Sequence, residues 1–244
     1  MALGPDRRFV LRTDTMTRGQ AEAAGIDVGL REYMLSVYNY MASGLALTGA
    51  VAYAVASSET LMQAIFGTGL FWIVALAPLP LVFFLSARIQ AMRATTAQVL
   101  FWVYAGLMGL SLASIFIMFT GVSIARVFFI SAGVFAAMSL YGYTTKRDLS
   151  GFGSFLFMGL IGIVLASLVN LFLQSAALQF VVSVIGVLVF VGLTAYDTQA
   201  IKSIYQVSDS GEILGKKAIL GALRLYLDFI NMFIMLLHLF GERR

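Results

Sequence analysis

The apolar residues of this 244-residue chain gather in seven long stretches that are separated by short polar segments. Each stretch is close to the ~20 residues that an α-helix needs to cross the hydrocarbon core of a bilayer. The pattern predicts an all-α integral membrane protein, with a polar tail over residues 1–34 and a membrane domain over residues 35–241. The expected spans are 35–56, 69–87, 97–119, 125–143, 153–173, 177–199 and 219–240.

The seventh stretch differs from the others because it carries four polar side chains, those of Arg224, Asp228, Asn231 and His238. Ionisable side chains in a membrane face protein or water rather than lipid. We therefore expect this helix to be the central one, with the other six around it. The sequence leaves two alternatives for the C-terminus: the last helix crosses the bilayer, or it re-enters and returns to the same side.

Composition agrees with the membrane assignment. Charged residues make up 11% of the chain, against about 25% in soluble domains. Most of the 16 Lys and Arg residues lie on the side of the N-terminal tail, so the positive-inside rule places the N-terminus in the cytoplasm of a multi-pass protein of the cell (inner) membrane. The chain has no cysteine and one histidine, which excludes thiolate and multi-histidine metal motifs. We expect no cofactor and no nucleic-acid partner.

Two aspartates stand in the last two apolar stretches at matched positions. Asp197 precedes Ser208 by 11 residues, and Asp228 follows Lys217 by 11 residues. If the two stretches are antiparallel helices joined by a turn at 208–217, both carboxyl groups lie at one depth, roughly 8–16 Å from the turn. Two carboxyl groups within hydrogen-bond distance cannot both ionise cheaply and therefore share a proton. This chemistry suits a pH sensor.

The alternative is that each aspartate bonds a neighbour on its own helix. Asp228 would then pair with Arg224 one turn back, and Asp197 would bond Tyr196 or Thr194. Asn231 lies one turn from Asp228 and is placed to orient it, so Asn231 and Arg224 are candidate supporting residues under either interpretation.

The second stretch adds a candidate latch and a candidate hinge. Pro78 and Pro80 leave the carbonyls of Val74 and Leu76 without helical donors and bend the helix; the bend is either a hinge or purely structural. Arg88 ends this stretch on the same side as Asp197. An arginine–carboxylate contact there would hold the second helix to the sixth. The alternative for Arg88 is an arginine that reaches the membrane interface.

Three segments resemble signatures of the transmembrane Bax inhibitor motif family, in its bacterial form: YGYTTKRDL at 141–149, TAYDTQ at 194–199 and ALRLYLDFINMF at 222–233. The resemblance covers about residues 30–240. It implies seven helices with six around a central seventh, and a pH-sensitive calcium leak gated by paired aspartates that map onto Asp197 and Asp228. It also implies links to protection against cell death and, in bacteria, to a membrane protease.

Two classes of function follow. The first is a cation leak, with calcium ions and protons as partners, in which Asp197 and Asp228 coordinate calcium only weakly and transiently because calcium prefers six to eight oxygen ligands. Acid would protonate the pair, free Arg88 and open the path. The second is a regulatory membrane protein that binds a membrane protease or another membrane complex through the tail 1–34, without transport. An enzyme is not expected, because Leu227-Asp228 does not match the second motif of intramembrane aspartyl proteases.

Overall fold

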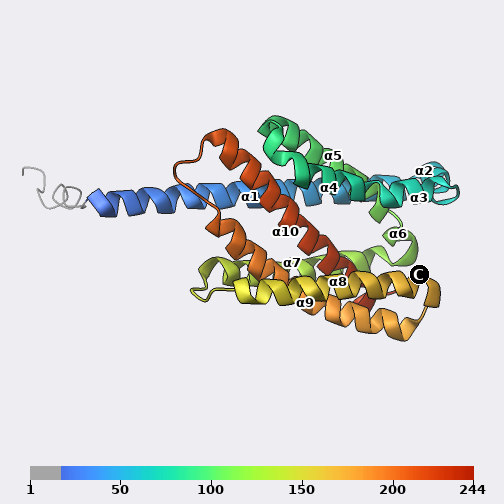
Figure 1. Ribbon diagram of the computed structural model, residues 1–244. Coiled ribbons are helices and arrows are strands. Elements are labelled where there is room, and N and C mark those ends of the chain that lie inside the picture. The colour runs from blue at the N-terminus through green and yellow to red at the C-terminus, as the bar shows by residue number, and fades with distance from the viewer. Residues whose placement is uncertain (1–17) are drawn as a thin grey trace, which may run out of the picture.

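The computed structural model describes residues 18–244, with side-chain environments from Val28 onward, so residues 1–17 of the predicted tail lie outside it. Within that range the secondary structure is helical apart from one isolated bridge (Figure 1). The elements are α1 (Arg18–Ala56), α2 (Glu59–Phe66), α3 (Leu70–Leu76), α4 (Pro78–Arg88), the 3-10 turn η1 (Ile89–Ala91), α5 (Ala94–Leu112), α6 (Ile115–Met118), α7 (Gly121–Thr144), α8 (Ser150–Leu173), α9 (Ala176–Ser203) and α10 (Gly211–Phe240).

Six of these helical runs are long and apolar enough to cross a membrane, namely α3 to η1, α5 with α6, α7, α8, α9 and α10. A seventh is added if α1 from Val28 and α2, which meet at a bend of 98°, count as one span. A chain of this kind can satisfy its backbone hydrogen bonds inside lipid only as helices, because no water is available there. The protein is therefore a multi-pass membrane protein with six to seven candidate spans.

Helix α10 is the most enclosed of the candidate spans. In its most apolar stretch 67% of the residues are buried, against 33% in α9 and 11–28% in the others. It packs against α1, α5, α7 and α9, whereas α8 packs mainly against α9. Its aromatic side chains supply much of the contact, since Tyr226 meets Phe101 and Tyr104 of α5 edge-on, and Phe229 meets Phe128 and Phe135 of α7.

Two glycines allow α9 to approach its neighbours closely. A Cβ on Gly142 of α7 would lie 2.2 Å from the carbonyl oxygen of Ala195, and one on Gly153 of α8 would lie 2.6 Å from the ring of Tyr196. The TAYDTQ segment of α9 thus meets α7 at backbone distance, and it meets α8 through the ring of Tyr196.

Pro78 stands at the break between α3 and α4, where the sequence predicted a bend. The carbonyl of Val74, which has no helical donor, accepts a hydrogen bond of 2.6 Å from the Ser111 hydroxyl of α5. The Val74 carbonyl is therefore satisfied despite the proline, because a side chain of a neighbouring helix replaces the missing backbone donor.

Helix α10 runs for 30 residues without a break and ends beside the turn that precedes α7. The C-terminal residues are fastened there: Thr120 N donates to Glu242 O at 3.0 Å, and Arg126 pairs with the Glu242 carboxylate at 3.0 Å. The start of α1 and the C-terminus lie at opposite ends of the bundle (Figure 1). Helix α10 is thus one unbroken helix that is long and apolar enough to be a candidate span.

Candidate functional site

A cavity of 550 Å³ lies among α8, α9 and α10, and it is the place where the polar groups of the predicted spans gather. Helix α8 contributes small and apolar residues to it, whereas α9 and α10 contribute the ionisable ones. Its lining comprises Gly153, Ser154, Phe157, Leu160, Phe190, Leu193, Tyr196, Asp197, Arg224, Leu227, Asp228 and Asn231.

Both predicted aspartates face this cavity, Asp197 from α9 and Asp228 from α10, and their carboxyl groups lie close enough to interact directly. Asp228 is 5% exposed. Its Oδ2 atom is buried and has no hydrogen-bond donor among residues 28–244. A buried carboxyl oxygen without a donor is costly unless a proton, a cation or water reaches it. The site therefore has the means to bind a proton or a cation.

The two aspartates do not meet for the reason that the equal spacing suggested. Helix α9 ends at Ser203, six residues after Asp197, and α10 begins at Gly211, 17 residues before Asp228. The segment 211–217 is therefore not a turn but the first two turns of α10, which Ser210 caps at its N-terminus. The loop 204–210 spans the difference of 11 residues, about 16 Å of helix. The two carboxyl groups are brought together by the way α9 and α10 cross. Equal spacing from a turn is not the cause.

The cation at the pair is Arg224. Its Nη1 lies 3.9 Å from Asp197 Oδ1, so one residue of α10 pairs across to α9. Arg224 stands one turn before Asp228, on the same face of α10. The Arg224 side chain is 49% exposed, and that of Asp197 is 15% exposed. The guanidinium thus lies between the buried carboxyl groups and the more exposed side of the cavity.

Arg88 does not approach the pair, which corrects the prediction for this residue. It is exposed at the end of α4 and makes no ion pair within the described part of the chain. The neighbouring Gln90 carbonyl accepts a hydrogen bond from Lys216 at 3.3 Å. Lys216 precedes Asp228 by 12 residues, about 18 Å along α10. Arg88 therefore belongs to the N-terminal end of the bundle and not to the depth of the carboxyl pair.

Thr194 and Asn231 use their hydrogen-bond donors on their own helices rather than on the aspartates. Thr194 donates to Phe190 O at 2.8 Å, one turn back on its own helix, and therefore does not serve Asp197. Asn231 donates to Leu227 O at 2.8 Å, so its amide nitrogen does not hold Asp228, although the residue lines the cavity. The partner of Asp197 is the arginine of the facing helix.

Sequence reasoning missed Gln199, two residues beyond Asp197. Its Oε1 accepts from Leu149 N and its Nε2 donates to Arg147 O, both at 2.8 Å, which clamps the α7–α8 connection onto α9. In the same connection, hydrogen bonds from the Ser150 side chain and backbone lower the pKa of the exposed Asp148 carboxyl. The sequence offered one signal for this role, because Gln199 is a polar residue inside the TAYDTQ segment. Gln199 fixes the motif of the fourth connection against the motif that carries Asp197.

The helices and the carboxyl pair define a multi-pass membrane protein with ionisable residues on its last two helices. A family model described as inhibitor of apoptosis-promoting Bax1 matches residues 30–244, and the chain belongs to this family. This confirms the resemblance of the three sequence segments.

The relatives are bacterial. The chain is 56% identical over 219 residues to the inner membrane protein YbhL of Escherichia coli strain K12, an alignment that covers 88% of this chain and 94% of YbhL. It is 52% identical over 218 residues to protein RP147 of Rickettsia prowazekii, covering 89% of this chain and 92% of that protein. A protein of Caulobacter vibrioides is 44% identical over 229 residues, covering 90% and 92%.

Proposed function

We propose that the protein is a pH-sensitive leak pathway for cations, calcium foremost, in which Asp197 and Asp228 form the proton switch. The observation that carries this proposal is the meeting of two carboxyl groups at one cavity inside apolar helices, with a buried oxygen of Asp228 that no described donor satisfies. Carboxyl groups in such surroundings mark proton and ion paths in membrane proteins. Two carboxylates are too few to hold calcium tightly, so coordination is weak and transient.

The proposed setting is the inner membrane, in agreement with the description of the relative YbhL as an inner membrane protein. The chain crosses it seven times, with α1 and α2 as one bent span and α10 as the central helix. The N-terminus is cytoplasmic, in accordance with the concentration of Lys and Arg at that end. In this arrangement the cavity of Asp197 and Asp228 lies between α8 and α10, and α9 forms its third wall.

Arg224 has two roles in this mechanism. It holds α10 to α9 through its ion pair with Asp197, here called the tether, and its positive charge repels cations from the cavity, here called the plug. With a proton shared by the two carboxyl groups, the Arg224 charge brings the cluster close to neutrality, which the low-dielectric interior favours. The guanidinium stands in the cavity that a cation would enter. Acid protonates Asp197, ends its attraction to Arg224 and lets the half-exposed side chain relax toward water. The α9–α10 tether is then lost and the positive charge leaves the path.

The test is calcium flux into liposomes that hold the purified protein, measured from acid to alkaline pH. We expect flux to rise on acidification. Replacing Asp197→Asn removes the charged partner of Arg224, so flux at alkaline pH should rise about fivefold, because a half-exposed ion pair is worth about 1 kcal/mol. Its pH dependence should also flatten. Asp148→Asn, on an exposed carboxyl outside the spans, is the matched control and should leave the profile unchanged.

A wild-type flux that climbs steadily from acid to alkaline pH would contradict this mechanism, because repulsion between the ionised carboxyl groups would then open the path. If flux does not exceed that of empty liposomes at any pH, the proposal that the protein is a leak pathway is wrong.

A second candidate function is regulation of a membrane protease or another membrane complex without transport. The observation that favours it is the N-terminal part of α1, which extends beyond the rest of the bundle (Figure 1). Deleting residues 1–20 separates the two. A leak through the cavity should survive the deletion, whereas a complex held by the tail should be lost in a co-purification with the candidate protease.

A further inference from the structure

A second cavity, of 520 Å³, lies between α1 and α7, and it shares no lining residue with the cavity of the carboxyl pair. These two helices each pack against α10 but make little contact with each other. The space that they leave, called here the α1/α7 crevice, opens toward the surroundings of the bundle. Its volume falls within the roughly 300–1,000 Å³ of ordinary ligand sites.

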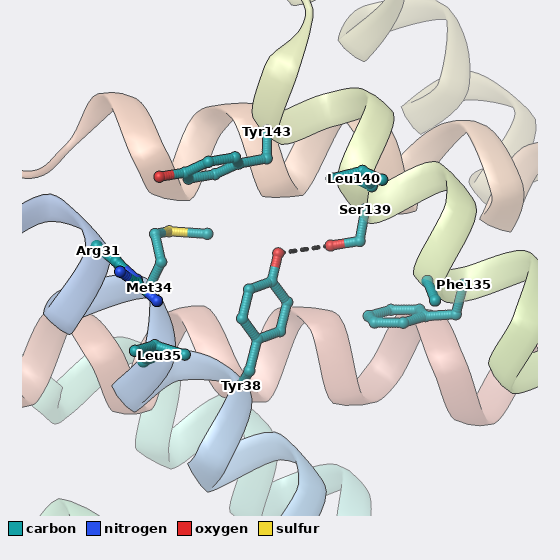
Figure 2. Close-up of a pocket in the computed structure, with 9 residues that line it drawn as sticks. Arg31, Met34, Leu35, Tyr38, Phe135, Ser139, Leu140 and Tyr143 are labelled. Carbon is teal, nitrogen blue, oxygen red and sulfur yellow. Dashed lines mark hydrogen bonds between the residues drawn. The ribbon is translucent and has the colours of Figure 1, made fainter. Parts of the chain in front are cut away.

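The walls of the α1/α7 crevice are apolar. Met34 and Leu35 line it from α1, and Phe135, Ala136 and Leu140 line it from α7 (Figure 2). In a bilayer such a crevice does not stay empty, since its walls would lose the dispersion contacts that a hydrocarbon chain supplies. The occupant of this part must be apolar.

The polar groups inside the crevice are already satisfied. Tyr38 Oη lies 2.6 Å from Ser139 Oγ (Figure 2), and Ser139 Oγ lies 3.0 Å from Thr198 Oγ1. The Thr198 hydroxyl donates to Thr194 O at 2.7 Å. The hydrogens therefore run in one direction, from Tyr38 to Ser139 to Thr198, and none is left to donate to a ligand. This argues against a polar solute in the middle of the crevice.

One end of the crevice is positively charged. Arg31 lies there with Tyr143, opposite the end formed by Phe135 (Figure 2). Lys202 donates to Tyr143 O at 2.8 Å, and its ammonium lies 4.9 Å from the centre of the Tyr143 ring. Neither Arg31 nor Lys202 has a carboxylate partner among residues 28–244, the part of the chain whose side chains are described. The neighbouring Glu32 lines a different cavity.

The spans expected from the sequence place the charged end at the level of lipid headgroups. Arg31 precedes the first expected span, 35–56, by four residues, about 6 Å, and Tyr143 closes the fourth. Tyrosines concentrate at this interface, and basic clefts between membrane helices suit anionic headgroups. The crevice has apolar walls and satisfied polar groups, with Arg31 at its interfacial end and Lys202 against Tyr143 there. Neither cation has a carboxylate partner among residues 28–244, so the crevice has the shape and charge of one lipid molecule.

We propose that the α1/α7 crevice binds one anionic phospholipid of the leaflet at the N-terminal end of the bundle. The phosphate lies at Arg31 and Lys202, and an acyl chain lies along Met34, Leu35, Ala136 and Leu140. This site is independent of the proposed leak, because none of these residues lines the cavity of Asp197 and Asp228.

The test is the number and affinity of lipids retained by the full-length protein in detergent, measured by native mass spectrometry with added phosphatidylglycerol. Diacylglycerol, which lacks the phosphate, and inorganic phosphate, which lacks the chains, serve as the two comparison ligands. We expect one tightly retained phosphatidylglycerol per chain, weak retention of diacylglycerol and no competition by inorganic phosphate.

Two matched pairs of variants place the lipid. Arg31→Gln should weaken phosphatidylglycerol binding about fivefold, the effect of one basic residue near a membrane surface, whereas Arg93→Gln, at the same end of the bundle, should not. Ala136→Phe fills the crevice and should abolish retention. Ala137→Phe, the adjacent exposed position that does not line it, should leave retention intact. All four variants alter exposed side chains, and thermal unfolding in detergent verifies that each is folded.

Equal retention by Ala136→Phe and Ala137→Phe would overturn the proposal, as would equal affinity for phosphatidylglycerol and diacylglycerol. If Ala136→Phe converts a dimer to a monomer and leaves the retained lipid unchanged, the crevice holds a second copy of the chain and the proposal is wrong.

Discussion

Helix α10 carries two polar clusters on opposite sides, and they differ in how their hydrogen bonds are met. On the side of α1 and α5, Tyr226 bonds Thr48 at 2.7 Å, and the Thr48 hydroxyl reaches two backbone carbonyls, at 2.9 and 2.8 Å. On the side of α8 and α9, Asp228 keeps a buried oxygen without a donor from residues 28–244, beside Asp197 and Arg224. Only two positions separate Tyr226 from Asp228.

The difference indicates that the Tyr226 cluster contributes to packing, whereas the Asp228 cluster has groups that can exchange protons or cations. The Tyr226 cluster is neutral, and its two hydroxyl groups are satisfied, so it adds specificity to the packing of α10 and has little left to exchange. The Asp228 cluster holds charge, borders a cavity of 550 Å³ and includes a half-exposed arginine. Proton or cation exchange requires these features. Polar residues on one strongly enclosed helix can thus serve stability on one face and the proposed proton exchange on the other.

The largest effect is expected from making the charged cluster neutral. Asp228→Asn removes the shared proton and leaves Asp197 to titrate alone beside Arg224, so the rise of calcium flux in liposomes should shift to more acidic pH. The free energy of unfolding should stay the same or rise by about 1 kcal/mol, since the new amide can donate to Asp197. Flux measured across pH, together with thermal unfolding in detergent, checks both. A variant that keeps the wild-type pH profile would separate Asp228 from the gate.

The next effect concerns the cation. Arg224→Gln removes the tether and the plug, so flux at neutral pH should rise about fivefold, the value of a half-exposed ion pair. Arg88→Gln is the matched arginine variant and should change flux little, because Arg88 lies about three turns of helix from the depth of the pair. The reverse result, a strong effect of Arg88 and none of Arg224, would restore the latch that the sequence suggested.

A smaller effect, on stability alone, is expected from the neutral cluster. Tyr226→Phe deletes the hydroxyl that donates to Thr48 and should lower the free energy of unfolding by about 1–3 kcal/mol, since a buried acceptor is left unmet. Its pH profile of flux should remain that of the wild type. Tyr53→Phe, on an exposed ring of α1, is the control. A changed pH profile in Tyr226→Phe would mean that the two faces of α10 are coupled.

The smallest effect is expected at the proline break. Ser111→Ala removes the hydroxyl that donates to the Val74 carbonyl. The free energy of unfolding should fall by about 1 kcal/mol, as measured by thermal unfolding. If the break is also a hinge for the leak, flux should rise in the same variant; Ser114→Ala, whose hydroxyl bonds only within its own segment, controls for a general loosening. Unchanged flux would make the bend purely structural.

The spans were predictable because they depend on local properties of the chain. A segment in lipid must pair its own backbone groups, and apolar length alone marks it. The stretch 153–173 differs from α8 (Ser150–Leu173) only at its start, and 125–143 lies inside α7 (Gly121–Thr144). The enclosure of α10 also followed from sequence, since a helix with polar side chains along its length cannot face lipid over that length.

The same local reasoning placed the polar segment 208–217 in a turn and chose Arg88 as the cation. Polarity does not distinguish a turn from a helix that rises out of the membrane, so the first turns of α10 were missed. Arg224 was in view, but only as a partner of Asp228 on its own helix.

The sequence by itself determined that the chain is built of apolar helices, that the last of them is strongly enclosed, and that two carboxyl groups stand in the last two. These properties need only periodicity, length and the cost of charge in hydrocarbon. The tertiary structure decided which groups meet: Arg224 with Asp197, Ser111 with Val74, and an open crevice between α1 and α7. Contacts of this kind depend on the crossing and rotation of whole helices, which result from the packing of all side chains together.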